Sequence, residues 1–153
     1  MDNKNLRKPF YQILLTAFVF GAVSFLAKML LFPAPQYNPP AVYAFLSAFL
    51  VASILWYAVI SLVEKISVLW GFTTGLAIGF LTPLVMWFLF GVITSLEPES
   101  RDALGWSIIY AYIALKGLAW ITALCGGMIG AVLALLLKQI SSNRYRSTDI
   151  GAA

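Results

Sequence analysis

Four long apolar runs dominate this chain and limit what it can fold into. They cover residues 10–32, 41–63, 68–94 and 117–137, and the only charge within them is Lys28 in the first run. A helix needs about 20 apolar residues to cross the hydrocarbon core of a membrane, whereas the strands of a membrane barrel are short and alternate polar with apolar residues. We therefore expect an all-α membrane protein in which four transmembrane helices form a bundle.

The low charge content of the chain excludes the main alternatives. Charged residues make up 10% of its 153 residues and hydrophobic residues 61%, whereas a soluble domain carries roughly 25% charged residues. So little charge excludes both an ordinary soluble domain and a disordered chain. The single cysteine excludes a disulfide-bonded scaffold.

The segments between the runs indicate how the helices connect. Residues 33–40 contain four prolines and no charge, which predicts a short non-helical turn. Residues 64–67 are so few that the second and third runs must form an antiparallel hairpin, and residues 95–102 form an acidic connection. We expect one transmembrane domain over residues 1–140, followed by a polar cytoplasmic tail over residues 141–153.

The distribution of Lys and Arg predicts which side of the membrane each segment faces. The third connection holds one cation, Arg101, whereas the N-terminal segment, the second connection and the segment from residue 138 onward hold seven. These seven are Lys4, Arg7, Lys8, Lys65, Lys138, Arg144 and Arg146. Because cytoplasmic segments carry the excess of Lys and Arg, we expect both termini in the cytoplasm. The same positions account for the net charge of +4 without a nucleic-acid partner.

The fourth run is too long for one span if its upstream neighbours are included. Residues 104–137 would make a helix of about 51 Å, compared with a hydrocarbon core of about 30 Å. We expect a break near Lys116 and Gly117, with residues 104–115 as a helix that lies in the outer interface. The alternative is one continuous helix that protrudes outward.

The tryptophans fall into two groups by their depth in the predicted spans. Those near the ends of the runs are expected at the membrane interfaces, where Trp is enriched; they are Trp56, Trp70 and Trp106. Trp87 and Trp120 lie deeper, so we expect them to pack between helices.

Small residues and one proline indicate how the helices pack and bend. Small residues let helix backbones approach closely in a membrane, and they recur at a spacing of four: Gly71, Gly75 and Gly79 in the third run, and Gly126 and Gly130 in the fourth. These glycines form a glycine face on each helix. We expect it either to pack against another helix of the same bundle or to contact a second copy of the chain. Pro83 should bend the third helix, either as a fixed bend or as a hinge.

The chain offers no constellation for catalysis, a cofactor or a metal. It has no histidine, which removes the commonest general base and metal ligand. Cys125 has no activating partner and is expected to be inert packing. All six acids lie in connections or tails, whereas proton-coupled carriers usually keep a carboxylate inside the membrane. We therefore expect no enzyme, no cofactor and no metal site.

Two lysines inside the predicted membrane region are the best binding candidates. Lys28 lies about one turn before the proline-rich connection, and Lys116 lies at the expected helix break. Each side chain either extends to the outer interface or contacts an anion or a lipid headgroup.

Two stretches carry a resemblance to a known family. The first is a Gly-x-Val-Ser helix with a lysine and a proline-rich segment: Gly21-Ala22-Val23-Ser24, Lys28, Pro33, Pro35, Pro39 and Pro40. The second is Lys65-Ile66-Ser67-Val68-Leu69-Trp70-Gly71, followed by Gly75. In this order the chain resembles the YagU-like bacterial inner-membrane proteins, a small multi-span family without an assigned biochemical activity. The resemblance implies a bacterial inner membrane. The family has an arginine in its proline-rich segment, which this chain lacks, so a shared role of the outer face is not expected.

The leading hypothesis is a small multi-pass membrane protein with a non-catalytic accessory, interaction or membrane-stress role. Its expected partners are the lipid bilayer and either a second copy of the chain or another membrane protein. The alternative is an oligomeric channel or carrier for an anion or a lipid headgroup, which the glycine series and Pro83 favour. A third hypothesis is a lipid-handling protein in which Lys28 and Lys116 hold headgroups beside Trp106.

Overall fold

The computed structural model describes residues 3–31, 39–62, 67–97, 100, 102–117 and 119–150. Within these residues the regular elements are helices, without any strand. They are α1 (Asn3–Leu31), α2 (Ala41–Leu62), α3 (Val68–Ser95), α4 (Ala103–Gly117) and α5 (Ala119–Ile150). The prediction of an all-α fold is confirmed.

Segments of α1, α2, α3 and α5 are long and apolar enough to cross a membrane. These segments are Phe10–Leu30, Ala41–Ser61, Val68–Ser95 and Ala119–Gln139. They coincide with the four apolar runs of the sequence, so the prediction of a bundle with four membrane-spanning helices is confirmed.

The starts of two helices follow from the residues immediately before them. Ser67 has an extended backbone, and its hydroxyl oxygen accepts a hydrogen bond from the Trp70 N–H at 3.3 Å, which caps α3. In the first turn of α2, the Tyr43 N–H donates to the Pro40 carbonyl oxygen at 3.0 Å. Prolines are tolerated at such a position because the first N–H groups of a helix need no helical partner.

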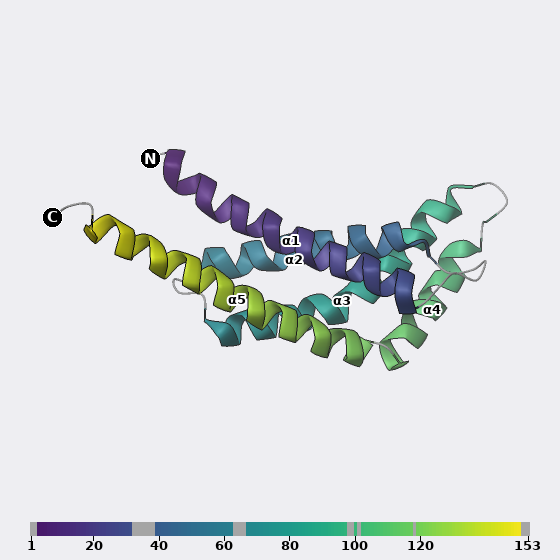
Figure 1. Ribbon diagram of the computed structural model, residues 1–153. Coiled ribbons are helices and arrows are strands. Elements are labelled where there is room, and N and C mark those ends of the chain that lie inside the picture. Colours follow the sequence, from purple (N-terminus) through teal and green to yellow (C-terminus); the bar gives the residue numbers. More distant parts are fainter. Residues whose placement is uncertain are drawn as a thin grey trace.

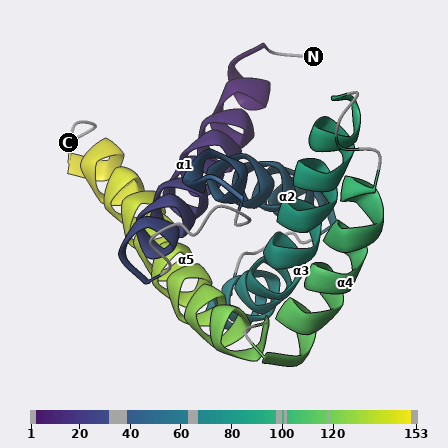
Figure 2. The same cartoon turned by 90° about the vertical axis from the view of Figure 1, so that its right-hand side faces the viewer.

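The helices form two antiparallel pairs. α1 packs along α2, α3 packs along α5, and α2 packs on α3, which joins the pairs. In Figure 1 the first turn of α1 and the last turn of α5 lie at one end of the bundle, and α4 lies at the other. Figure 2 shows the bundle from the α4 end. The cytoplasmic location of the two termini stays a prediction.

The region of the fourth run is divided between two helices. α4 ends at Gly117 and α5 begins at Ala119, so the predicted break is confirmed. α4 lies along the C-terminal half of α3, where Ser107 is beside Gly91, and α5 lies along the N-terminal half. The 28 residues of α3 make a helix of about 42 Å, which two shorter helices cover in succession. The location of α4 in the outer interface stays a prediction.

Close backbone contact holds α3 against α5. Along this contact the facing pairs are Gly71 with Gly130, Gly75 with Gly126, and Gly79 with Thr122. A Cβ atom added at Gly75 would overlap the carbonyl oxygen of Gly126, and one added at Gly130 would overlap the carbonyl oxygen of Gly71. The structure therefore places the glycine face inside the bundle, where its lack of side chains permits this approach.

The bundle core corrects the predictions for two tryptophans. Trp56 is 0% exposed, so its prediction as an interface residue is wrong. It follows the buried Ala48 and Ala52 at a spacing of four, which places it on the same buried side of α2. Trp120 is 67% exposed, although we expected packing. It directly follows the buried Ala119 and therefore points to a different side of α5.

α5 continues beyond the predicted end of the fourth span. We expected the span to end at residue 137, whereas the helix continues to Ile150. Residues 138–150 contain neither proline nor glycine, and Gly151, a residue type that commonly ends helices, follows them. The polar sequence at the end of the chain therefore extends α5 past the segment that can cross a membrane.

Candidate functional site

A cavity of about 380 Å³ lies between α1 on one side and α3, α4 and α5 on the other. We call it the central cavity. α1 packs mainly on α2, and α5 packs mainly on α3, so α1 and α5 have little direct contact and leave a space beside the α2–α3 contact. Ala44 of α2 also borders this space.

One side of α1 forms the first wall of the central cavity. Its lining residues are Phe20, Val23, Ser24, Ala27 and Lys28. Their spacing of three and four residues places them along one side of a helix. Phe20 belongs to the buried core, whereas Lys28 is half-buried in the last turn of α1. The wall extends about 12 Å along the helix axis from Phe20 to Lys28, from an apolar end to a charged end.

The second wall comes from the middle of α3. Ile78, Gly79, Thr82 and Pro83 border the cavity, and all four are buried. α3 continues through Pro83, which has no N–H to donate to the Gly79 carbonyl oxygen. The Thr82 hydroxyl donates to the Ile78 carbonyl oxygen at 2.7 Å, so its donor is used within the helix. The hinge role of Pro83 stays a prediction.

The third wall crosses the break between α4 and α5. Its lining residues include Tyr110, Ile113, Ala114, Thr122 and Cys125. The Tyr110 ring stacks on the Trp87 ring of α3, with centroids 4.9 Å apart and planes inclined by 18°, which fastens α4 to α3. The Cys125 thiol is exposed at this wall rather than enclosed in packing as we expected.

Lys28 gives the central cavity its chemistry. Among the described residues that border the cavity, it has the one charged side chain, and most of the others are apolar. An uncharged apolar wall with one ammonium group suits a ligand that has an apolar body and one anionic group. For metals, the described part of the chain holds no cluster of three or more His, Cys, Asp or Glu residues.

The second candidate lysine lies outside the cavity. Lys116 is exposed in the last turn of α4, and its Nζ atom lies 4.6 Å from the centre of the Tyr112 ring. This is the geometry of a cation–π contact. Lys116 does not border the central cavity, so the structure does not bring Lys28 and Lys116 together in one site.

The other predicted residues divide between the cavity and the α3–α5 contact. Gly79 and Gly126 border both, and Pro83 borders the cavity. The remaining three lie in the α3–α5 contact alone: Gly71, Gly75 and Gly130. Sequence reasoning did not assign Tyr110 or Cys125 to a site. They border one wall because α4 and α5 are separate helices that both pack on α3, an arrangement that apolar periodicity does not determine.

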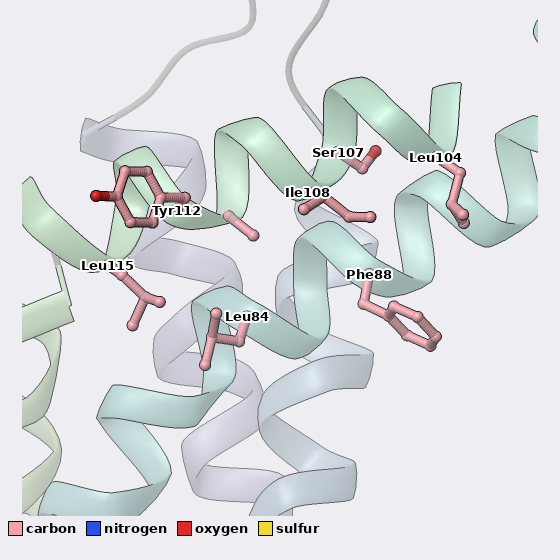
Figure 3. Close-up of a pocket in the computed structure, with 8 residues that line it drawn as sticks. Leu84, Phe88, Leu104, Ser107, Ile108, Tyr112 and Leu115 are labelled. Atoms are coloured by element: carbon pink, nitrogen blue, oxygen red, sulfur yellow. The ribbon is translucent and has the colours of Figure 1, made fainter. Parts of the chain in front are cut away.

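A second hollow, of about 370 Å³, lies along the contact between α3 and α4 (Figure 3). Figure 3 shows side chains of both helices along it, among them Leu84 and Phe88 of α3 and Leu104 and Leu115 of α4. Ser107 also borders this hollow, but none of the described residues around it is charged. It therefore lacks a group that could bind an anionic head.

The central cavity is thus the candidate site, because it combines apolar walls with a convergent charged group. No protein-family model, curated protein or solved structure matches this chain.

Proposed function

We propose that this membrane protein has no catalytic activity and holds an anionic amphiphile, meaning a molecule with an apolar body and one anionic head, in the central cavity. Lys28 binds the head, and the apolar walls surround the body. The observation that carries this proposal is the position of Lys28 at one end of a cavity whose other described lining residues are uncharged.

Electrostatics favours an anion beside Lys28. A lysine at the centre of a bilayer costs roughly 2.5–3.5 kcal/mol on insertion scales, and less near a helix end. Lys28 lies in the last turn of α1, where the negative end of the helix dipole stabilises a cation. An anionic head would add charge-assisted hydrogen bonds, each contributing about 1.5–3 kcal/mol.

The size of the cavity also supports a ligand. Ligand pockets in proteins have volumes of about 300–1,000 Å³, and the central cavity, at about 380 Å³, lies within that range. A space of this size lined by apolar groups favours an apolar body over a bare inorganic anion, because the anion would leave the apolar walls without contacts.

The sequence supports a role without catalysis in a bacterial inner membrane. The chain has no histidine, and its six acids lie outside the four apolar runs, so the runs offer no general base or proton-coupling carboxylate. The excess of Lys and Arg at one end supports cytoplasmic termini. The resemblance to the YagU-like proteins supports the bacterial inner membrane.

One observation that favoured the channel or carrier alternative is explained by packing within a single chain. It relied on the glycine face as an interface between copies, and that face contacts α5 of the same chain. An additional membrane-protein partner stays a prediction.

Native mass spectrometry of the full chain, released from a mild detergent, tests the proposed function. The comparison uses wild type, Lys28→Gln and Lys116→Gln, all prepared from the same membranes. Lys116→Gln is a matched control, because it removes the same charge from the last turn of α4, at a side chain that does not border the cavity.

Wild type and Lys116→Gln should retain an anionic lipid or fatty acid, and Lys28→Gln should retain at least about tenfold less. Equal retention by all three proteins, or the absence of any anionic adduct, would contradict the proposed function.

A further inference from the structure

We infer that the central cavity accepts one apolar chain, so that its ligand is a single-chain anionic amphiphile such as a fatty acid or a lysophospholipid. This inference rests on the proposed function and adds the shape of the ligand to it. Three features support it: the volume of the cavity, the separation of its charged and apolar ends, and the closure of its inner end.

The volume matches one chain. An apolar cavity of about 150 Å³ holds a benzene ring, which has six carbon atoms. On that scale, the central cavity of about 380 Å³ holds roughly fifteen carbon atoms. One common acyl chain has about this number of carbon atoms, and the two chains of a diacyl phospholipid have about twice as many. At the packing density of a protein interior, the second chain has no space between the walls of the cavity.

The two ends of the cavity differ in polarity. Lys28 lies at one end of the α1 wall, and Phe20 lies about 12 Å away along the helix axis. Phe20 is 3% exposed and Ile78 is 1% exposed, and both belong to the buried core. These side chains close the inner end with an apolar surface, which a chain terminus can contact but a charged head cannot without a large desolvation cost. The head therefore lies at Lys28, and the chain points toward Phe20 and Ile78.

Carboxylate and phosphate heads share the chemistry that Lys28 recognises. Each presents anionic oxygen atoms that accept hydrogen bonds from an ammonium group. A fatty acid supplies the first head and a lysophospholipid the second, so the experiment includes a probe for each.

Photo-crosslinking of the full-length protein in phosphatidylcholine bilayers tests the inference. Three probes carry a photoreactive diazirine at the end of the same acyl chain: palmitate, lysophosphatidylglycerol and diacyl phosphatidylglycerol. Peptide mapping then measures labelling at the inner end of the cavity, at Phe20, Ile78 and Ile129, all of which border it. Lys28→Gln and its control Lys116→Gln report the contribution of the head.

A second pair of variants changes the space available to the chain. Ala114 borders the cavity and is 8% exposed, so Ala114→Leu fills part of the volume. Ala131 is half-buried on α5 and does not border the cavity, so Ala131→Leu is the matched control. If Ala114→Leu does not fold, labelling of the wild-type protein by the three probes still tests the inference.

At least one single-chain probe should label the inner end at least about tenfold more than the diacyl probe, and Lys28→Gln should lower that labelling about tenfold. Whether palmitate or lysophosphatidylglycerol labels more strongly identifies the head. Equal or stronger labelling by the diacyl probe, still dependent on Lys28, would overturn the single-chain inference and leave the proposed function intact. Labelling that is absent or independent of Lys28 for all three probes would overturn both.

Discussion

At the scale of single residues, two buried polar groups of the bundle lack a hydrogen-bond partner within the described part of the chain. They are the Thr16 hydroxyl and the Trp56 indole N–H. Thr16 is 1% exposed and lies next to Ala17 and near Phe20 in the core. Burying an unpaired hydroxyl costs about 1–3 kcal/mol. The bundle is therefore less stable than it would be with an apolar side chain of the same shape at such a position.

Thr16→Val should raise the stability of the protein by about 1 kcal/mol, because the substitution keeps the shape and removes the unpaired hydroxyl. The measurement is the change in the free energy of unfolding in detergent. Thr82→Val is the control, since the Thr82 hydroxyl already donates to the Ile78 carbonyl oxygen. A loss of stability in Thr16→Val equal to that in Thr82→Val would show that Thr16 has a partner in the folded protein.

The glycines of the α3–α5 contact make a second residue-scale prediction. Gly75→Ala should destabilise the protein by about 1–3 kcal/mol, because its Cβ atom would overlap the Gly126 carbonyl oxygen and the backbones would have to separate. Gly105→Ala in α4 is the control, because an added Cβ meets no atom within 4 Å there. It should be neutral or slightly stabilising, since Ala favours a helix more than Gly. Thermal unfolding of the two variants checks the difference, and equal midpoints would refute this packing.

At the scale of elements, Pro83 separates the two halves of α3. Pro83→Ala restores an N–H that can donate to the Gly79 carbonyl oxygen, and it should therefore raise the unfolding temperature. The hinge hypothesis also predicts slower exchange of the bound amphiphile in this variant. Exchange can be followed by transfer of a labelled fatty acid to empty vesicles. A rate equal to that of wild type would mean that Pro83 only bends α3.

The ends of α2 and α3 could be predicted from the sequence, whereas α1 begins before its apolar run and α5 continues beyond its run, because polar residues extend both helices. Runs without charge placed α2 and α3 to within one residue, and helix length against membrane thickness placed the break after Gly117. It was harder to predict which face of each helix is buried. Every side of a membrane helix is apolar, so the spacing of apolar residues does not distinguish the buried face from the face toward lipid. That is why Trp56 was expected at an interface and Cys125 in packing, although small residues at a spacing of four did indicate the α3–α5 contact.

At the scale of the whole molecule, the first turn of α1 and the last turn of α5 lie at one end of the bundle (Figure 1), and the charge distribution predicts that this end is cytoplasmic. Single cysteines at Ser100 and Ser142, introduced after Cys125→Ala, test the orientation in intact cells. A maleimide that cannot cross the membrane should label the residue 100 variant at once and the residue 142 variant only after permeabilisation. The reverse pattern would place the termini outside.

The candidate site also belongs to the scale of the whole molecule. Lys28 could be singled out from the sequence because it was the one charge within the four runs. The cavity beside it could not, because it depends on how α1 and α5 are placed around the α2–α3 contact and takes lining residues from all five helices. Lys116 was an equal candidate by composition, and only the packing of α4 shows that it lies outside the cavity.

The central claim is a direct contact between the Lys28 amine and an anionic head, and solid-state NMR can measure it. The protein carries ¹⁵N-lysine in bilayers with either ¹³C-carboxylate palmitate or ³¹P-containing lysophosphatidylglycerol. We expect a lysine Nζ signal with a head atom within about 4 Å, present in wild type and Lys116→Gln and absent in Lys28→Gln. A signal that persists in Lys28→Gln, or no coupling to either head, would contradict the claim.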